Sequence, residues 1–138
     1  MLAIGCFYLV FWALVSFYPT PVDGAGFMPD VVANILNLTG YLGLSNIINY
    51  AFLEAFANVL FYVPIGIFIG AVFRRFSLWR NLYLAFAISL AAETLQGIFI
   101  SRRVSSWLDV WHNLLGAALG LMLMQLAESR SQRDRHRK

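Results

Sequence analysis

Three acidic residues stand in or at the edge of long apolar stretches of this sequence, where inserting a charged side chain into a membrane costs about 2.5 to 3.5 kcal/mol. Each has an amide residue about one helical turn further on, so both side chains would lie on one face of a helix. Polar groups inside a membrane bind ligands, carry protons or join helices by hydrogen bonds. The pairs are Glu54 with Asn58, Glu93 with Gln96, and Asp109 with Asn113.

Two arginines, Arg102 and Arg103, stand between the second and third of these pairs. A guanidinium group can bind a phosphate or a carboxylate through two parallel hydrogen bonds. The arginines would therefore either anchor a helix end among lipid headgroups or serve a binding site. A bond to Glu93 or Asp109 would also lower the cost of burying both charges.

His112 adds an imidazole beside these carboxylates. Two carboxylates, a histidine and an arginine suffice for acid–base chemistry, but the sequence has no Gly-x-Ser-x-Gly nucleophile motif. The neighbouring arginines would repel a cation, and one histidine is a small basis for a zinc site. We expect no metal and no cofactor, and we expect His112 to be a hydrogen-bonded residue of a helical bundle.

The composition places these residues in a membrane protein. Of the 138 residues, 60% are hydrophobic and 12% are charged, against about 25% charged in soluble domains. The mean hydropathy is +0.70. Half of the ten Lys and Arg lie in residues 130–138, so the net charge of +3 indicates a basic tail rather than a nucleic-acid surface. The single cysteine, Cys6, excludes an internal disulfide.

Four apolar stretches approach the roughly 20 residues that a transmembrane helix needs. The first is expected to be a retained helix rather than a signal peptide, because no Lys or Arg precedes Arg74. The fold class is therefore predicted as an all-α, polytopic membrane helical bundle. We expect a transmembrane domain over residues 1–128 and a basic cytoplasmic tail over 129–138. The four expected spans are Leu2–Tyr18, Phe52–Phe73, Leu82–Ile100 and Trp107–Leu126.

The distribution of positive charge predicts the orientation. With both termini in the cytoplasm, the inner side receives the tail and the loop that carries Arg74, Arg75 and Arg80. Arg102 and Arg103 are then the only basic residues outside. This arrangement, N-in and C-in, places all three acid–amide pairs in the outer half of the membrane.

The segment 19–49 differs from the spans, because it holds three of the four prolines and several glycines among apolar residues. We expect a loop with a short helix that lies on the membrane surface or re-enters the membrane. Asp30 would be the N-cap of that helix.

Small residues predict where the spans pack. Pro64 removes a backbone donor and should kink the second span, while glycines four residues apart allow close helix packing. Each glycine pair follows an acid–amide pair, a pattern that suggests two related helical hairpins. The glycine pairs are Gly66 with Gly70 and Gly116 with Gly120.

Three segments, taken together, resemble the signatures of the VanZ-like family. In the family a single arginine precedes the aspartate, so either Arg102 or Arg103 is the equivalent residue. The resemblance spans Glu54 to Gly120 and implies a bacterial multi-pass membrane protein. The family is named after a member of a glycopeptide-resistance cluster that lowers sensitivity to teicoplanin. The segments are 56–66, which holds Asn58 and Pro64, 89–96, which holds Glu93 and Gln96, and 107–120, which holds Asp109 and Asn113.

We expect an inner-membrane protein whose outer polar cavity binds a lipid headgroup, a lipid-linked cell-wall precursor or an amphiphilic drug, and so protects the cell envelope. One alternative is an intramembrane enzyme that acts on a lipid, although the sequence has no clear nucleophile motif. A second is a small proton-coupled transporter using Glu93, which would need a homodimer because four helices are few for a conduit. The expected partner is a membrane lipid or a lipid-linked precursor. We expect no nucleic-acid partner.

Overall fold

The computed structural model describes residues 2–17, 28–99 and 106–135, and within them every regular element is a helix. The helices α3, α4 and α5 are apolar and long enough to cross a membrane. At 1.5 Å per residue, the 23 residues of α3 extend about 34 Å, against a hydrocarbon core of about 30 Å. The five helices are α1 (Leu2–Ser16), α2 (Met28–Tyr41), α3 (Tyr50–Val72), α4 (Leu78–Phe99) and α5 (Trp107–Arg135).

The prediction of an all-helical fold is confirmed for the described residues, and three of the four expected spans form helices that are long and apolar enough to cross a membrane. The first stretch forms α1, which has 15 residues and extends only about 22 Å. The third predicted span starts four residues earlier than expected, at Leu78, because Ser77 accepts a hydrogen bond from the backbone N–H of Arg80 with its Oγ, at 3.4 Å. The last helix continues through the basic segment to Arg135.

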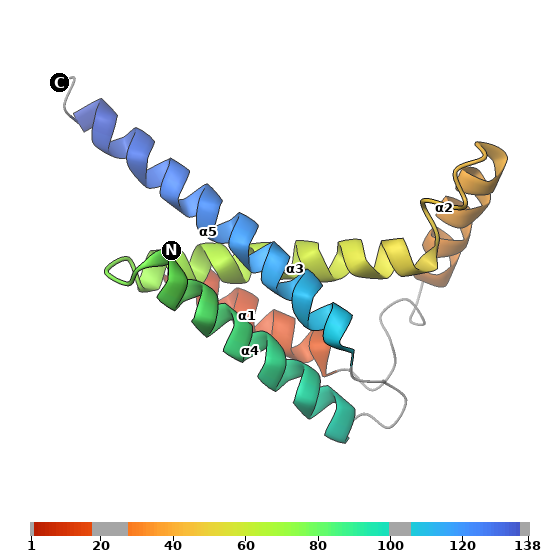
Figure 1. Ribbon diagram of the computed structural model, residues 1–138, viewed down its shortest axis with the longest axis horizontal. Helices are drawn as coiled ribbons and strands as arrows, with labels where there is room; N and C mark the ends of the chain where they lie inside the picture. Colours follow the sequence, from red (N-terminus) through yellow and green to blue (C-terminus); the bar gives the residue numbers. More distant parts are fainter. Residues whose placement is uncertain (1, 18–27, 100–105, 136–138) are drawn as a thin grey trace.

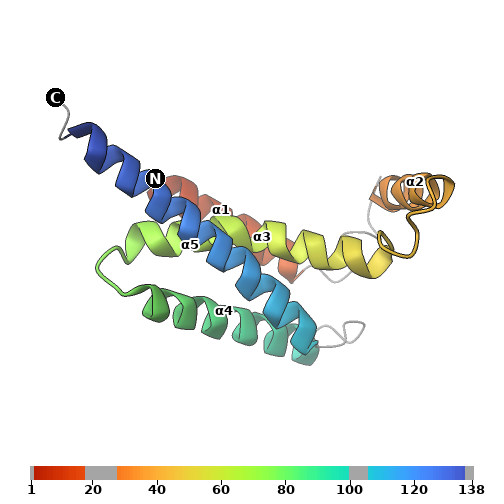
Figure 2. The same ribbon diagram turned by 45° about the horizontal axis from the view of Figure 1, so that its top comes forward.

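Successive long helices run in opposite directions (Figure 1). The start of α1, the end of α3, the start of α4 and the end of α5 lie at one end of the bundle, on the left of Figure 1 and again in Figure 2. The other end holds the end of α1 and the starts of α3 and α5, and α2 lies beyond it, away from the bundle. We call the first the termini end and the second the polar end.

The α2 helix corrects one local expectation. Asp30 was predicted as the N-cap, but the helix begins at Met28 and Asp30 lies in its first turn. A carboxylate in the first turn still interacts favourably with the helix dipole. Thr39 holds the following chain close to α2. Its buried hydroxyl lies 2.9 Å from the carbonyl oxygen of Leu36 in the helix and 3.2 Å from that of Ile48, so these two acceptors share its one hydrogen.

The core lies where α3 and α5 cross, and the two backbones approach closely there (Figure 1). A Cβ atom added to Gly66 would overlap with the carbonyl oxygen of Ala117. A Cβ added to Gly116 would overlap with the Val59 carbonyl, and one added to Gly120 with the Val63 carbonyl. Three glycines therefore determine the distance between these helices. Around them pack Tyr62, Ile65, Ile69, Ala85, Ala117 and Leu121.

Gly70 is the remaining glycine of the two predicted pairs, and it has more free space around it than the other three. Its added Cβ would lie 3.2 to 3.3 Å from side-chain atoms of Met124 and Leu121, which can shift slightly. Further along, an ion pair of 2.9 Å joins Arg74 after α3 to Glu128 of α5. The α3 helix passes through Pro64 as one continuous element.

The α1 helix packs against α3 around that proline. The Tyr8 hydroxyl donates a 2.7 Å hydrogen bond to the carbonyl of Phe61, in the turn before Pro64. The ring of Trp12 meets the ring of Tyr62 edge-on, with centroids 5.6 Å apart.

The glycine contacts lead to a stability prediction. Gly66→Ala and Gly120→Ala should each destabilise the purified protein by about 1 to 3 kcal/mol, because an added methyl group meets backbone that cannot turn away. Thermal unfolding in detergent measures the effect. Gly40→Ala in α2 is the matched control, since its added Cβ meets nothing within 4 Å and alanine favours a helix. Equal shifts for all three variants would contradict this packing.

Candidate functional site

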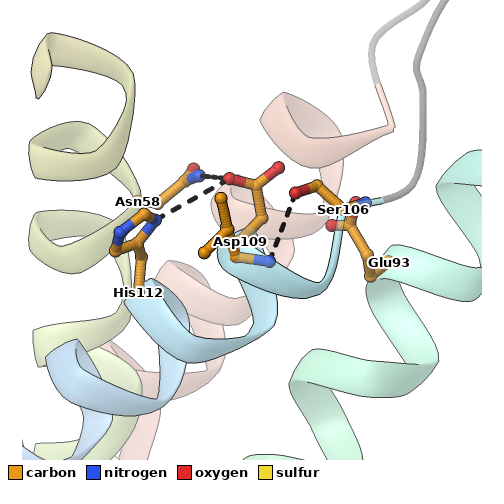
Figure 3. A network of polar contacts seen from close by, with 6 residues as sticks. Asn58, Glu93, Ser106, Asp109 and His112 are labelled. Atoms are coloured by element: carbon orange, nitrogen blue, oxygen red, sulfur yellow. Dashed lines mark hydrogen bonds and ion pairs between the residues drawn. The ribbon is translucent and has the colours of Figure 1, made fainter. Parts of the chain in front are cut away.

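The polar end joins α3 to α5 through the side chains of Asn58 and Asp109. Asn58 Nδ2 donates to Asp109 Oδ1 at 2.9 Å, a charge-assisted hydrogen bond between two helices (Figure 3). Both side chains are short, so the bond requires the close α3–α5 approach that the glycines allow. Two members of different predicted pairs therefore meet each other.

Asp109 also has His112 as a neighbour on its own helix. His112 Nδ1 lies 3.9 Å from Asp109 Oδ1, which is too far for a hydrogen bond (Figure 3). In the part of the chain that the structure describes, this Nδ1 atom has no hydrogen-bond partner. The His112 side chain is 33% exposed and that of Asp109 is 24% exposed, although the Nδ1 atom itself is buried. An incoming ligand would therefore reach the imidazole through its other ring atoms.

Glu93 connects α4 to the start of α5. The residue is 7% exposed, and its Oε1 accepts a 2.7 Å hydrogen bond from the backbone N–H of Ser106 (Figure 3). Ser106 in turn caps α5, because its Oγ accepts from the N–H of Leu108 at 3.2 Å. The buried carboxylate thus determines where α5 begins.

Ser106 and Asp109 have the spacing of a capping box, in which the acidic residue would bind the N–H of the cap. Glu93 from α4 occupies that donor instead. Asp109 is consequently available to Asn58 on α3. Because Glu93 takes the place of Asp109 at the cap, the start of α5 is bonded both to α4 through Glu93 and to α3 through Asn58.

Gln96 completes the polar end by holding α1. The residue is 9% exposed, and its Nε2 donates to the carbonyl of Ser16, in the last turn of α1, at 2.9 Å. Glu93 and Gln96 lie on one buried face of α4, as their spacing predicts. That face therefore contacts both the end of α1 and the start of α5.

Buried polar groups continue deeper into the bundle. Asn113 is 6% exposed and Ser89 is fully buried, and in the described chain Asn113 Oδ1 has no hydrogen-bond partner. The buried Tyr62 lies close to Ser89 and to Glu93. Sequence reasoning missed Tyr62, Ser89 and Ser106, and only Ser106 carries a sequence signal, the spacing Ser-x-x-Asp before an apolar run.

One expected site residue is placed differently, and two others lie outside the described residues. Glu54 was expected to point into the bundle with Asn58, but it is exposed. The start of α3 extends past the neighbouring helices toward α2, so helical periodicity alone could not bury this residue (Figure 1). Arg102 and Arg103 lie outside the described residues, in the segment directly before Ser106.

Among the described residues, no group of three His, Cys, Asp or Glu side chains gathers closely enough to hold a metal ion. The polar end offers hydrogen-bond donors and acceptors instead, with the carboxylate of Asp109 and the imidazole of His112 as its accessible groups.

Long apolar helices with a polar cluster at one end of the bundle define the class, which is that of a helical membrane protein. The family model of VanZ/LLP1 matches residues 5–128. The chain therefore belongs to the VanZ/LLP1 family, and the resemblance of the three motif segments is confirmed. No curated protein and no solved structure gives a match.

The Glu93 contact yields a prediction that separates the hydrogen bond from the charge. Glu93→Ala should destabilise the protein by about 1 to 3 kcal/mol, because the Ser106 N–H loses its acceptor. Glu93→Gln keeps an acceptor oxygen at the same position and should cost less than half as much. Thermal unfolding measures stability, and amide hydrogen exchange at 106–108 reports the cap directly.

Thr94→Ala is the matched control, since the exposed Thr94 hydroxyl bonds only within α4, to the carbonyl of Leu90, among the contacts of the described chain. If Glu93→Ala left exchange at the start of α5 as slow as in Thr94→Ala, the capping role of Glu93 would be wrong.

Proposed function

We propose that the chain is a multi-pass protein of the bacterial inner membrane, with α1, α3, α4 and α5 as spans and both termini in the cytoplasm. The alternating helix directions support this topology (Figure 1). Arg74, Arg75 and Arg80 lie in or beside the turn between α3 and α4, at the termini end, where Arg130 also belongs to the end of α5. Excess positive charge favours the cytoplasmic side. The short α1 is accommodated by local thinning of the bilayer.

The α2 helix lies in the outer interface rather than in the hydrocarbon. It extends crosswise to α3 beyond the polar end (Figures 1 and 2). One of its faces is exposed and apolar, with Val31, Ile35 and Leu38 at helical spacing. The adjoining face, about 100° further round the helix at 3.6 residues per turn, carries the exposed polar residues Asp30, Asn34 and Asn37. This two-sided pattern is typical of helices that lie in the plane of a membrane surface.

We propose further that the polar end binds the anionic headgroup of an amphiphile, such as a lipid-linked cell-wall precursor, and protects the envelope by doing so. The observation that carries the proposal is the Glu93 bond to the Ser106 N–H. That bond holds Ser106, which is three residues after Arg103 in the sequence. Arg102 and Arg103 are the two basic residues on the outer side in the proposed orientation, whereas positive charge usually gathers on the cytoplasmic side. A guanidinium group beside the headgroups binds phosphate bidentately.

The two accessible groups suit the rest of such a ligand. His112 can donate to a phosphate or sugar oxygen, and Asp109, already fixed by Asn58, can accept from a sugar hydroxyl.

A second candidate, an enzyme acting on the bound lipid, is favoured by one distance. Asp109 Oδ1 and His112 Nδ1 lie 3.9 Å apart, and apo structures often hold catalytic hydrogen bonds at such lengths. Accumulation of an unprocessed lipid in cells lacking the protein would support this candidate over binding alone.

The topology is tested by cysteine labelling. In a Cys6→Ala background, Ser45→Cys between α2 and α3 should react with a membrane-impermeant maleimide added to spheroplasts. Ser129→Cys near the end of α5 should react only after permeabilisation. The reverse pattern would contradict the orientation and with it the outer location of the polar end.

The binding function is tested with purified protein and a polyprenyl phosphate as the probe. Arg102→Ala combined with Arg103→Ala should weaken binding roughly 10- to 150-fold, because a charge-assisted hydrogen bond contributes about 1.5 to 3 kcal/mol. Arg130→Ala removes a positive charge from the other end and should leave binding unchanged. Cells carrying the double variant at normal membrane level should match the deletion strain in drug sensitivity. Unchanged binding in the double variant would overturn the proposal.

A further inference from the structure

A second feature of the molecule lies at the termini end, away from the polar cluster. An open groove of about 440 Å³ runs along the first turns of α4, beside the turn from α3. The groove begins near Phe76, whose ring stacks on Phe73 with centroids 5.1 Å apart. Its lining is almost entirely apolar, and it consists of Phe76, Trp79, Arg80, Tyr83, Leu84 and Ala87.

The one charged residue in this lining is Arg80. It stands at the start of α4, while Leu84 and Ala87 lie one and two turns further into the span. The groove therefore combines a cation at its membrane-surface end with an apolar floor that continues toward the membrane centre. This polarity matches a molecule with an anionic head and a hydrocarbon chain.

Two large aromatic side chains border the groove. Trp79 is 79% exposed and Tyr83 is 74% exposed, so in the folded chain both rings face outward from the bundle. Trp and Tyr prefer the headgroup level of a bilayer, where the ring contacts hydrocarbon and the polar atom contacts water or headgroups. Their spacing of four residues places both rings on the same side of α4.

Another basic residue of this turn is already paired. Arg74 forms its 2.9 Å ion pair with Glu128 and so holds α3 against α5. Arg80 instead lines the groove. Of these two cations, Arg80 is therefore the one whose side chain borders the apolar lining.

We propose that this groove is a binding site for one anionic glycerophospholipid of the leaflet at the termini end, which is the cytoplasmic leaflet in the orientation given above. The phosphate binds Arg80, and one acyl chain lies along Leu84 and Ala87, between Tyr83 and Phe76. Basic pockets on the cytoplasmic side of membrane helices have this kind of specificity. The site is independent of the polar end and does not rest on the headgroup function proposed there.

The test uses the full-length protein, delipidated in detergent and titrated with phosphatidylglycerol or phosphatidylcholine, with bound lipid counted by native mass spectrometry. The wild type should retain one phosphatidylglycerol in preference to phosphatidylcholine. Arg80→Ala should lower the affinity for phosphatidylglycerol about five-fold and leave that for phosphatidylcholine unchanged. Ala87→Trp, which fills the groove without changing charge, should weaken both lipids.

Arg130→Ala is the matched control, because it removes a cation from the same end of the molecule without touching the groove. An equal loss in Arg80→Ala and Arg130→Ala would show diffuse attraction and overturn the site. Unchanged lipid retention in Ala87→Trp would also overturn it. Normal polyprenyl phosphate binding in Arg80→Ala would confirm that the two ends act separately.

Discussion

A carboxylate buried among membrane helices has to be met by hydrogen-bond donors, and the arrangement of the polar end depends on how Glu93 meets this requirement. Its Oε1 accepts the backbone N–H of Ser106, a group that every helix start leaves without an intrahelical partner. This one contact lowers two free-energy costs: that of burying the Glu93 carboxylate and that of leaving the Ser106 N–H without an acceptor. Because Glu93 serves the cap, Asp109 can bind Asn58 on α3.

The glycine crossing is the second condition for this arrangement. Asn58 and Asp109 have short side chains, and they can reach each other only where the backbones of α3 and α5 come close. Gly116 provides that approach directly beside Asn58, where it packs on the Val59 carbonyl. The glycine packing between α3 and α5 and the hydrogen bond between Asn58 and Asp109 thus depend on the same short distance between the two helices. Lipid offers no hydrophobic drive for helix association, so both contributions are needed.

The two ends of the bundle differ in chemistry as a result. At the polar end, Gln96 and Glu93 use one face of α4 to hold the end of α1 and the start of α5. At the termini end, Arg74 and Glu128 join α3 to α5 by an ion pair, and an apolar groove with one arginine opens on α4. The polar end thus offers acceptors and an imidazole, whereas the termini end carries basic residues.

Much of the fold could be predicted from the sequence because hydropathy and helical spacing are local properties. They indicate the apolar helices and place Glu93 and Gln96 on one face. The prediction that Glu54 points into the bundle is wrong, because its exposure depends on how far α3 extends past its neighbours. Helical periodicity carries no information about that. The role of Ser106 is hidden because its key donor is a backbone N–H, while Tyr62 and Ser89 owe their proximity to packing between helices distant in sequence.

The central proposal is that headgroup binding at the polar end depends on the bond between Glu93 and the Ser106 N–H. Its most direct test measures unfolding temperature and polyprenyl phosphate affinity on the same samples of three variants. Glu93→Ala should lose both stability and affinity, Glu93→Gln should retain most of each, and Arg102→Ala combined with Arg103→Ala should lose affinity alone. Full affinity in a destabilised Glu93→Ala variant would contradict the claim, because binding would then not depend on the cap that Glu93 provides.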